Sequence, residues 1–128
     1  MDPKALKYSP THEWVHLDGD IATVGLSKFA VDQLTDLIVI DLPPVGKTLV
    51  AGKSFGEVES VKSVNDLYAP VAGEVVAVND AVAANLQILA EHPFDEGWLI
   101  KVKVDSTTLP ADLLDFDVYE KKIADEAH

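Results

Sequence analysis

Cysteine is absent from the 128 residues of this sequence, so the polypeptide itself can form no disulfide, no thiolate metal site and no thiol nucleophile. Long apolar runs are also missing, since none approaches the roughly 18 residues that a membrane-spanning helix needs. Residues 1–7 lack the apolar core of a signal peptide. We therefore expect a cytoplasmic protein that does not bind membranes.

Positive charge is scarce as well, with 10 Lys and Arg against 22 Asp and Glu and a formal net charge of −12. Such a field repels phosphate backbones and anionic lipids, which argues against a nucleic-acid or membrane-surface protein. Apolar residues make up 48% of the chain, enough for a globular core. The length fits one domain over residues 1–128, and we expect a monomer.

Short β-branched stretches dominate the hydrophobic pattern and are mostly bounded by turn residues, which favours a mainly β fold built as a small sandwich or barrel. In the last stretch, Trp98, Ile100, Val102 and Val104 share one predicted face, and two lysines share the other. The expected core spans about residues 8–104. The predicted strands cover residues 21–26, 38–42, 55–61, 73–78 and 98–104.

Helices are predicted at two places. Ser27 can cap a short helix that ends near Asp36. A C-terminal helical segment over about residues 109–126 starts at Pro110 and is either one long helix or two short ones. Its apolar stripe consists of Leu113, Leu114, Phe116, Tyr119 and Ile123. Residues 79–92 fit a turn or short helix followed by an extended piece.

Catalytic patterns are few. There is no glycine-rich phosphate loop and no Gly-x-Ser-x-Gly, and Ser60 has no evident base. His12 and His16 lie four residues apart, but their segment is predicted to be extended, which separates them by about 13 Å and disfavours a metal site. Nothing in the residues indicates an enzyme with covalent chemistry of its own.

Lys62 stands at a predicted bend between two strands. Along residues 55–62, Phe55, Glu57, Glu59 and Val61 are predicted to share one face, and the alternate residues share the other. Residues 63–66 favour turns, and the apolar pattern resumes at 67–68. A hairpin tip displays a side chain away from the domain, although by pattern alone an ordinary surface lysine is the simpler interpretation.

Several motifs in register resemble the H-protein family of the glycine cleavage system. Residues 56–62, GEVESVK, resemble that family's lipoylation motif, and residues 8–15, YSPTHEWV, resemble its opening. The likeness continues through residues 21–26, 42–46, 69–75 and 97–102, and through an acidic helical tail. Agreement over about a hundred residues is far more specific than one lysine.

The resemblance implies a lipoyl-domain-like barrel-sandwich hybrid with short flanking helices, and lipoic acid in amide linkage to Lys62. It implies a carrier, not an enzyme, which takes the aminomethyl group of glycine from a pyridoxal-phosphate glycine decarboxylase to a tetrahydrofolate-dependent aminomethyltransferase. A flavin-dependent dihydrolipoyl dehydrogenase then reoxidises the arm. All redox chemistry would come from the attached group, because the chain has no thiol.

The resemblance also implies a cleft that shelters the loaded arm, with Thr11, Glu13 and Asp66 at the matching positions, and recognition of Glu59 by the lipoylating enzyme. The chain departs from the family pattern at Gln33, where many relatives carry histidine, at residues 85–92 and at Phe94. Two alternatives stay open: another swinging-arm domain, carrying biotin or serving a ketoacid dehydrogenase, and a lipoyl donor or relay protein.

Overall fold

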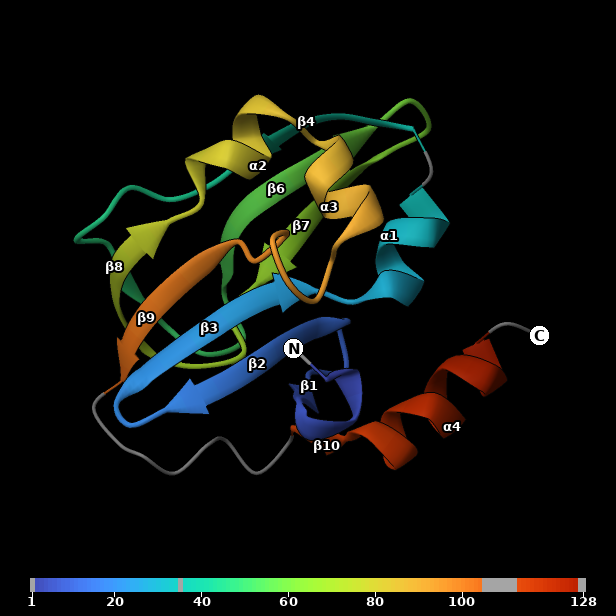
Figure 1. Cartoon of the computed structure of the whole chain (residues 1–128), viewed down its shortest axis with the longest axis horizontal. Coiled ribbons are helices and arrows are strands. Elements are labelled where there is room, and N and C mark those ends of the chain that lie inside the picture. Colours follow the sequence, from blue (N-terminus) through green and yellow to red (C-terminus); the bar gives the residue numbers. More distant parts are fainter. Residues whose placement is uncertain (1, 35, 105–112, 127–128) are drawn as a thin grey trace.

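Two antiparallel sheets face each other in the computed structural model, which describes residues 2–34, 36–104 and 113–126 (Figure 1). The larger sheet has the strand order β10-β1-β2-β3-β9-β8-β5, and the smaller sheet has the order β4-β6-β7. The strands of the larger sheet are β1 (Lys7–Tyr8), β2 (Glu13–Asp18), β3 (Ile21–Leu26), β5 (Thr48–Leu49), β8 (Gly73–Val78), β9 (Ile100–Val104) and β10 (Leu114–Asp115). The smaller sheet contains β4 (Leu37–Asp41), β6 (Ser54–Ser60) and β7 (Val64–Tyr68).

Short helices flank the sheets, and one longer helix ends the described chain. They are η1 (Pro3–Ala5), α1 (Lys28–Leu34), α2 (Asp80–Ala84), α3 (Gln87–Glu91) and α4 (Phe116–Glu126). The prediction of a mainly β fold is confirmed, and each predicted strand region contains a strand. In the part of the chain that the structure describes, no helix is both long and apolar enough to cross a bilayer.

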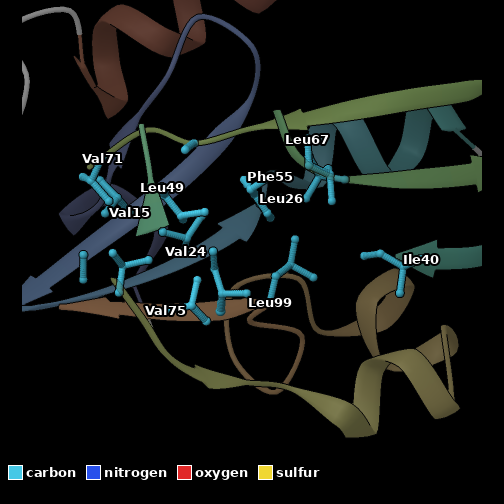
Figure 2. Packing of buried hydrophobic residues seen from close by; sticks show 14 of the residues in the cluster. Val15, Val24, Leu26, Ile40, Leu49, Phe55, Leu67, Val71, Val75 and Leu99 are labelled. Carbon is cyan, nitrogen blue, oxygen red and sulfur yellow. The ribbon is translucent and has the colours of Figure 1, made fainter. Parts of the chain in front are cut away.

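The main core fills the space between the sheets. Figure 2 shows side chains of both sheets pointing into it, including Val24 from β3, Leu67 from β7 and Ile40 from β4. Alternation along β9 works as predicted, because Ile100 and Val102 are buried while lysines occupy the alternate positions. Burial of side chains of this size stabilises the fold by about 1.5–3 kcal/mol each.

A second apolar cluster lies on the other side of the larger sheet and attaches α4. Tyr8, Trp14 and Tyr119 are buried in it, and Phe116 and Ile123 of α4 pack against them. Figure 1 accordingly shows α4 outside the larger sheet, beside β1 and β10.

Two predicted side-chain directions are wrong. Phe55 was expected to share a face with Glu57, but a register shift between Ser54 and Gly56 breaks the alternation, and Phe55 is buried in the main core. Trp98 lies before β9 instead of within it. It packs with the second cluster, and the Lys101 Nζ lies 5.1 Å from the centre of its ring.

The helix predictions are partly correct. Ser27 accepts a hydrogen bond from the Ala30 N–H at 3.3 Å and thus caps α1, as predicted. Residues 79–92 were expected to form a turn or short helix followed by an extended piece. The short helix is α2, but helix α3 takes the place of the extended piece, because Leu86 and Leu89 both pack on the main core. Near the C-terminus Leu114 pairs with Tyr8 as a strand, so the helix begins only at Phe116 and then runs as one helix through Val118. The start expected at Pro110 lies outside the described residues.

Candidate functional site

Lys62 lies exposed at the tip of the hairpin that joins β6 to β7. The buried Ser60 organises this tip: its hydroxyl oxygen accepts hydrogen bonds from the Lys62 and Ser63 N–H groups, both at 3.3 Å. The Val61 N–H donates to the carbonyl of Asp36 at 3.0 Å. The backbone on both sides of Lys62 is therefore held, while its side chain extends into solvent.

Glu59 lies beside the tip on the outer face of the smaller sheet. It pairs with Val39 of β4 and Val64 of β7, and paired residues share a sheet face. Both valines are about half exposed, at 47% and 58%, and Val61 at the tip is 67% exposed. This face thus combines exposed apolar groups with carboxylates, since Glu57 and Asp66 pair at the next position along it, an arrangement typical of a contact surface.

A cleft of about 640 Å³, here called the arm cleft, opens along β7, one of the two edge strands of the smaller sheet. Other parts of its lining come from α1 and from the turn that precedes β2. Since β7 begins two residues after Lys62, the cleft follows the strand that leads away from the hairpin tip. The lining residues are 10–13 and 64–68, together with Leu26, Phe29, Ala30, Gln33, Leu34 and Val58.

The three residues expected in such a cleft do meet there. Thr11 and Glu13 line one wall, and Asp66 lies on the β7 side, where it is exposed. The Tyr68 hydroxyl donates to the Asp66 carboxylate at 3.5 Å. Gln33, the position at which the sequence was expected to depart from the family pattern, lines the cleft too. The structure brings these residues together, and their roles remain predictions.

Glu13 is the most unusual group of the cleft, because its side chain is a buried carboxyl with 1% of the residue exposed. The hydroxyls of Ser9 and Thr11 both donate to Oε1, the first at 2.8 Å. The Tyr68 N–H, on β7 across the cleft, donates to Oε2 at 3.3 Å. Glu13 therefore joins the turn before β2 to the edge of the smaller sheet.

Burial raises the pKa of Glu13 from 4.5 to about 7, because a charged carboxylate loses its hydration there. The hydrogen bonds from Thr11, Ser9 and the Tyr68 N–H oppose this shift, since they stabilise the ionised form. The carboxyl can thus change protonation near neutral pH. A cation brought into the cleft would favour its ionised form.

His12 has a different place from the one expected. Its φ of +79° lies in the left-handed region, so the extended segment begins only at Glu13. Its ring lines the arm cleft, and Nδ1 lies 2.8 Å from the hydroxyl of Tyr119 on α4. A contact across 107 positions leaves no local pattern, and the sequence could indicate Tyr119 only as a member of an apolar stripe.

No group of three or more metal-ligating side chains occurs among residues that the structure describes. His16 lies within β2, opposite Thr23 of β3, while the His12 side chain contacts Tyr119. The two histidines therefore occupy different surroundings.

Comparison with known proteins gives a consistent result over nearly the whole chain. Residues 6–126 match the family model described as glycine cleavage H-protein. The chain is 51% identical over 126 residues to the glycine cleavage system H protein of Nitratidesulfovibrio vulgaris strain DP4, with 98% of each chain covered. It is 53% identical over 128 residues to the protein of that name from Rhodopirellula baltica, with 97% of this chain and 96% of the relative covered.

A solved structure agrees with the fold. The crystal structure of a glycine cleavage system H protein from Mycobacterium marinum is 38% identical in sequence and superposes with a TM-score of 0.88. The match covers 95% of this chain and 98% of that chain. The predicted barrel-sandwich hybrid with flanking helices is confirmed, in the form of two facing sheets that do not close into a barrel.

Proposed function

The chain belongs to the glycine cleavage H-protein family and is a lipoyl carrier of the glycine cleavage system, not a catalyst, and on this premise we propose that Lys62 holds the lipoyl group. The observation that carries the proposal is the exposed position of Lys62 at the tip of a hairpin held by Ser60. The amine is open to a modifying enzyme, and the supported backbone keeps it in one place.

The residues present fit the group. Amide formation replaces the Lys62 ammonium, whose usual pKa is about 10.4, with a neutral linkage. When bound, the dithiolane supplies a two-electron disulfide couple and a sulfur that accepts the aminomethyl group of glycine. The arm cleft, which starts beside the hairpin tip and is walled by apolar and acidic side chains, suits an apolar tether with a cationic end.

The cleft residues have separate roles in this proposal. Glu13 and Asp66 present carboxylates to the cationic amine of the aminomethyl cargo, and an opposite charge within about 4–6 Å favours its charged form. Thr11 orients the Glu13 carboxyl by donating a hydrogen bond to it. Glu59, on the outer face beside the tip, is recognised by the lipoylating enzyme.

The partners of the chain are the other enzymes of the glycine cleavage system. We propose that these are the pyridoxal-phosphate glycine decarboxylase, the tetrahydrofolate-dependent aminomethyltransferase and the FAD-dependent dihydrolipoyl dehydrogenase, besides the lipoylating enzyme. A tether raises the local concentration of its reactive end at each active site, to the millimolar range for short flexible linkers. The cytoplasmic location and the monomeric state stay predictions.

The deciding experiment is intact-mass analysis of the protein from lipoate-replete cells, followed by peptide mapping. We expect one lipoyl increment, located at Lys62. Lys62→Arg should fold normally, remain unmodified and lose glycine–bicarbonate exchange with the decarboxylase. Lys53→Arg, at another exposed lysine, is the matched control and should keep both the lipoyl increment and the exchange activity. A biotin increment, or a lipoyl group on Lys53, would refute the assignment.

A further inference from the structure

The Tyr119 hydroxyl contacts His12, which lines the arm cleft, and Ser27, which caps the helix α1 that lines another part of it. It lies 2.8 Å from Nδ1 of His12 and 2.6 Å from Oγ of Ser27. We propose that Tyr119 is a positioning residue: through these two contacts, α4 holds the turn that precedes β2 and the start of α1 in the arrangement that forms the cleft.

The turn of residues 9–13, here called the His12 turn, depends on an unfavourable backbone conformation. The left-handed φ of His12 is uncommon for a residue other than glycine and persists only when surrounding contacts enforce it. Two backbone bonds contribute, from the His12 N–H to the carbonyl of Ser9 at 3.0 Å and from the Ser27 N–H to the carbonyl of His12 at 2.9 Å. The contact with Tyr119 adds a restraint on the side chain.

The His12 turn is what brings the hydroxyls of Ser9 and Thr11 onto the Glu13 carboxyl. If His12 left the left-handed region, the residues on either side would no longer face the same point. The orientation of His12 and the surroundings of Glu13 are therefore linked by direct chain connection.

The second contact of Tyr119 acts on α1. Ser27 is both a partner of the Tyr119 hydroxyl and the residue that caps α1, through the Ala30 N–H. Phe29 and Gln33 of α1 line the cleft, and the His12 ring packs on Phe29 with 5.1 Å between ring centres. One hydroxyl thus contacts both the His12 turn and the residue that caps α1.

Tyr119 is well placed to hold the walls because its own ring is fixed. It is 3% exposed and stacks on Tyr8, with 4.3 Å between ring centres and 7° between ring planes. Tyr119 is absent from the cleft lining, so it acts through His12 and Ser27. A phenol hydroxyl can donate one hydrogen bond and accept another, which allows it to serve both partners.

The role of Tyr119 in retaining cargo rests on the proposed function. Its role in positioning the His12 turn and α1 does not, because those contacts exist without lipoate. The test therefore starts with the unmodified full-length chain. Tyr119→Phe removes the hydroxyl and keeps the stacked ring. Ile123→Val, which removes one methylene from the same face of α4, is the control for weaker helix packing.

We expect amide hydrogen exchange at His12 and Ser27 to become about tenfold faster in Tyr119→Phe than in Ile123→Val, as for the loss of one buried hydrogen bond. In ¹³C NMR titrations the pKa of the Glu13 carboxyl should fall from about 7 toward its usual value in Tyr119→Phe, because water reaches the loosened turn, and should stay in place in Ile123→Val. Ser27→Ala, which keeps Tyr119, should speed exchange at residues 27–30.

A role limited to stability gives a different result. Both α4 variants would then lower the melting temperature and change exchange uniformly, with no selective effect at His12, Ser27 or Glu13, and the proposal would be wrong. After lipoylation and loading by the decarboxylase, Tyr119→Phe should release its cargo several-fold faster than Ile123→Val. Failure of lipoylation at Lys62 would count against the proposed function, and the exchange and titration results would still test the inference.

Discussion

Glu13→Gln should change how the stability of the unmodified carrier depends on pH. In the wild type, Glu13 has an unfolded-state pKa near 4.5 and a folded-state pKa of about 7. Between these values the folded chain holds a proton that the unfolded chain has released. The free energy of unfolding therefore falls as pH rises, by about 1.36 kcal/mol per pH unit, and this contribution is complete below about pH 4.5 and lost by about pH 7.

The size of the effect follows from the structure. The full interval between the two pKa values corresponds to a change of about 3 kcal/mol in the free energy of unfolding. Glu13 is almost completely buried, so solvent does not screen the charge of its carboxylate. Glutamine has no such pH dependence. Its oxygen can still accept from Ser9 and Thr11, but its amide NH₂ cannot accept from the Tyr68 N–H, at a loss of about 1 kcal/mol.

The wild type should therefore be more stable than Glu13→Gln by about 1 kcal/mol near pH 4.5 and less stable by about 2 kcal/mol at pH 8, with the two curves crossing between about pH 5 and 6. Urea unfolding at half-unit pH intervals measures both curves. Their difference removes the contributions of all other titrating groups. A difference that stays constant from pH 4.5 to 8 would refute the argument that burial holds the proton on Glu13.

Three further outcomes are expected. Ser60→Ala removes the acceptor for the Lys62 and Ser63 N–H groups, so it should lower the free energy of unfolding in urea by about 1 kcal/mol. It should also slow lipoylation, measured by mass spectrometry. An unchanged lipoylation rate would show that the hairpin tip does not need Ser60. Gly25→Ala should lower the free energy of unfolding by about 2 kcal/mol or more, because the new Cβ would overlap the buried ring of Trp14. An unchanged melting temperature in thermal unfolding would contradict this packing. Asp66→Asn should be lipoylated at the wild-type rate yet release its aminomethyl cargo faster, because a neutral amide cannot form an ion pair with the cationic amine. Cargo release at the wild-type rate would show that Asp66 does not have the proposed role in the cleft.

Local pattern predicted the parts of the fold in which neighbouring residues decide the structure. The hairpin at Lys62 follows from a strand pattern interrupted by turn-forming residues, and β9 follows from strict alternation. The same reasoning was wrong for Phe55 and Trp98. Phe55 lies at a register shift in β6, and Trp98 lies before β9 and packs with the second cluster, so the positions of both depend on long-range packing.

The candidate site divides in the same way. The motif around Lys62 and the positions of Glu13 and Asp66 were indicated by a resemblance that spans most of the chain. The contact between His12 and Tyr119 arises only when α4 packs beside β1, more than a hundred positions away, and short-range spacing carries no information about it. Gln33 was singled out as a departure from the family pattern, and the structure places it in the lining of the cleft.

The outer edge of β7 has a consequence for self-association. An edge strand offers unpaired N–H and C=O groups on which another chain can add a strand. Here the edge is five residues long, its Tyr68 N–H is already bound by the Glu13 carboxyl, and Asp66 adds charge beside it. The carboxyl that lies in the cleft therefore also occupies a backbone donor of this edge, which disfavours the addition of a strand from a second copy at that position.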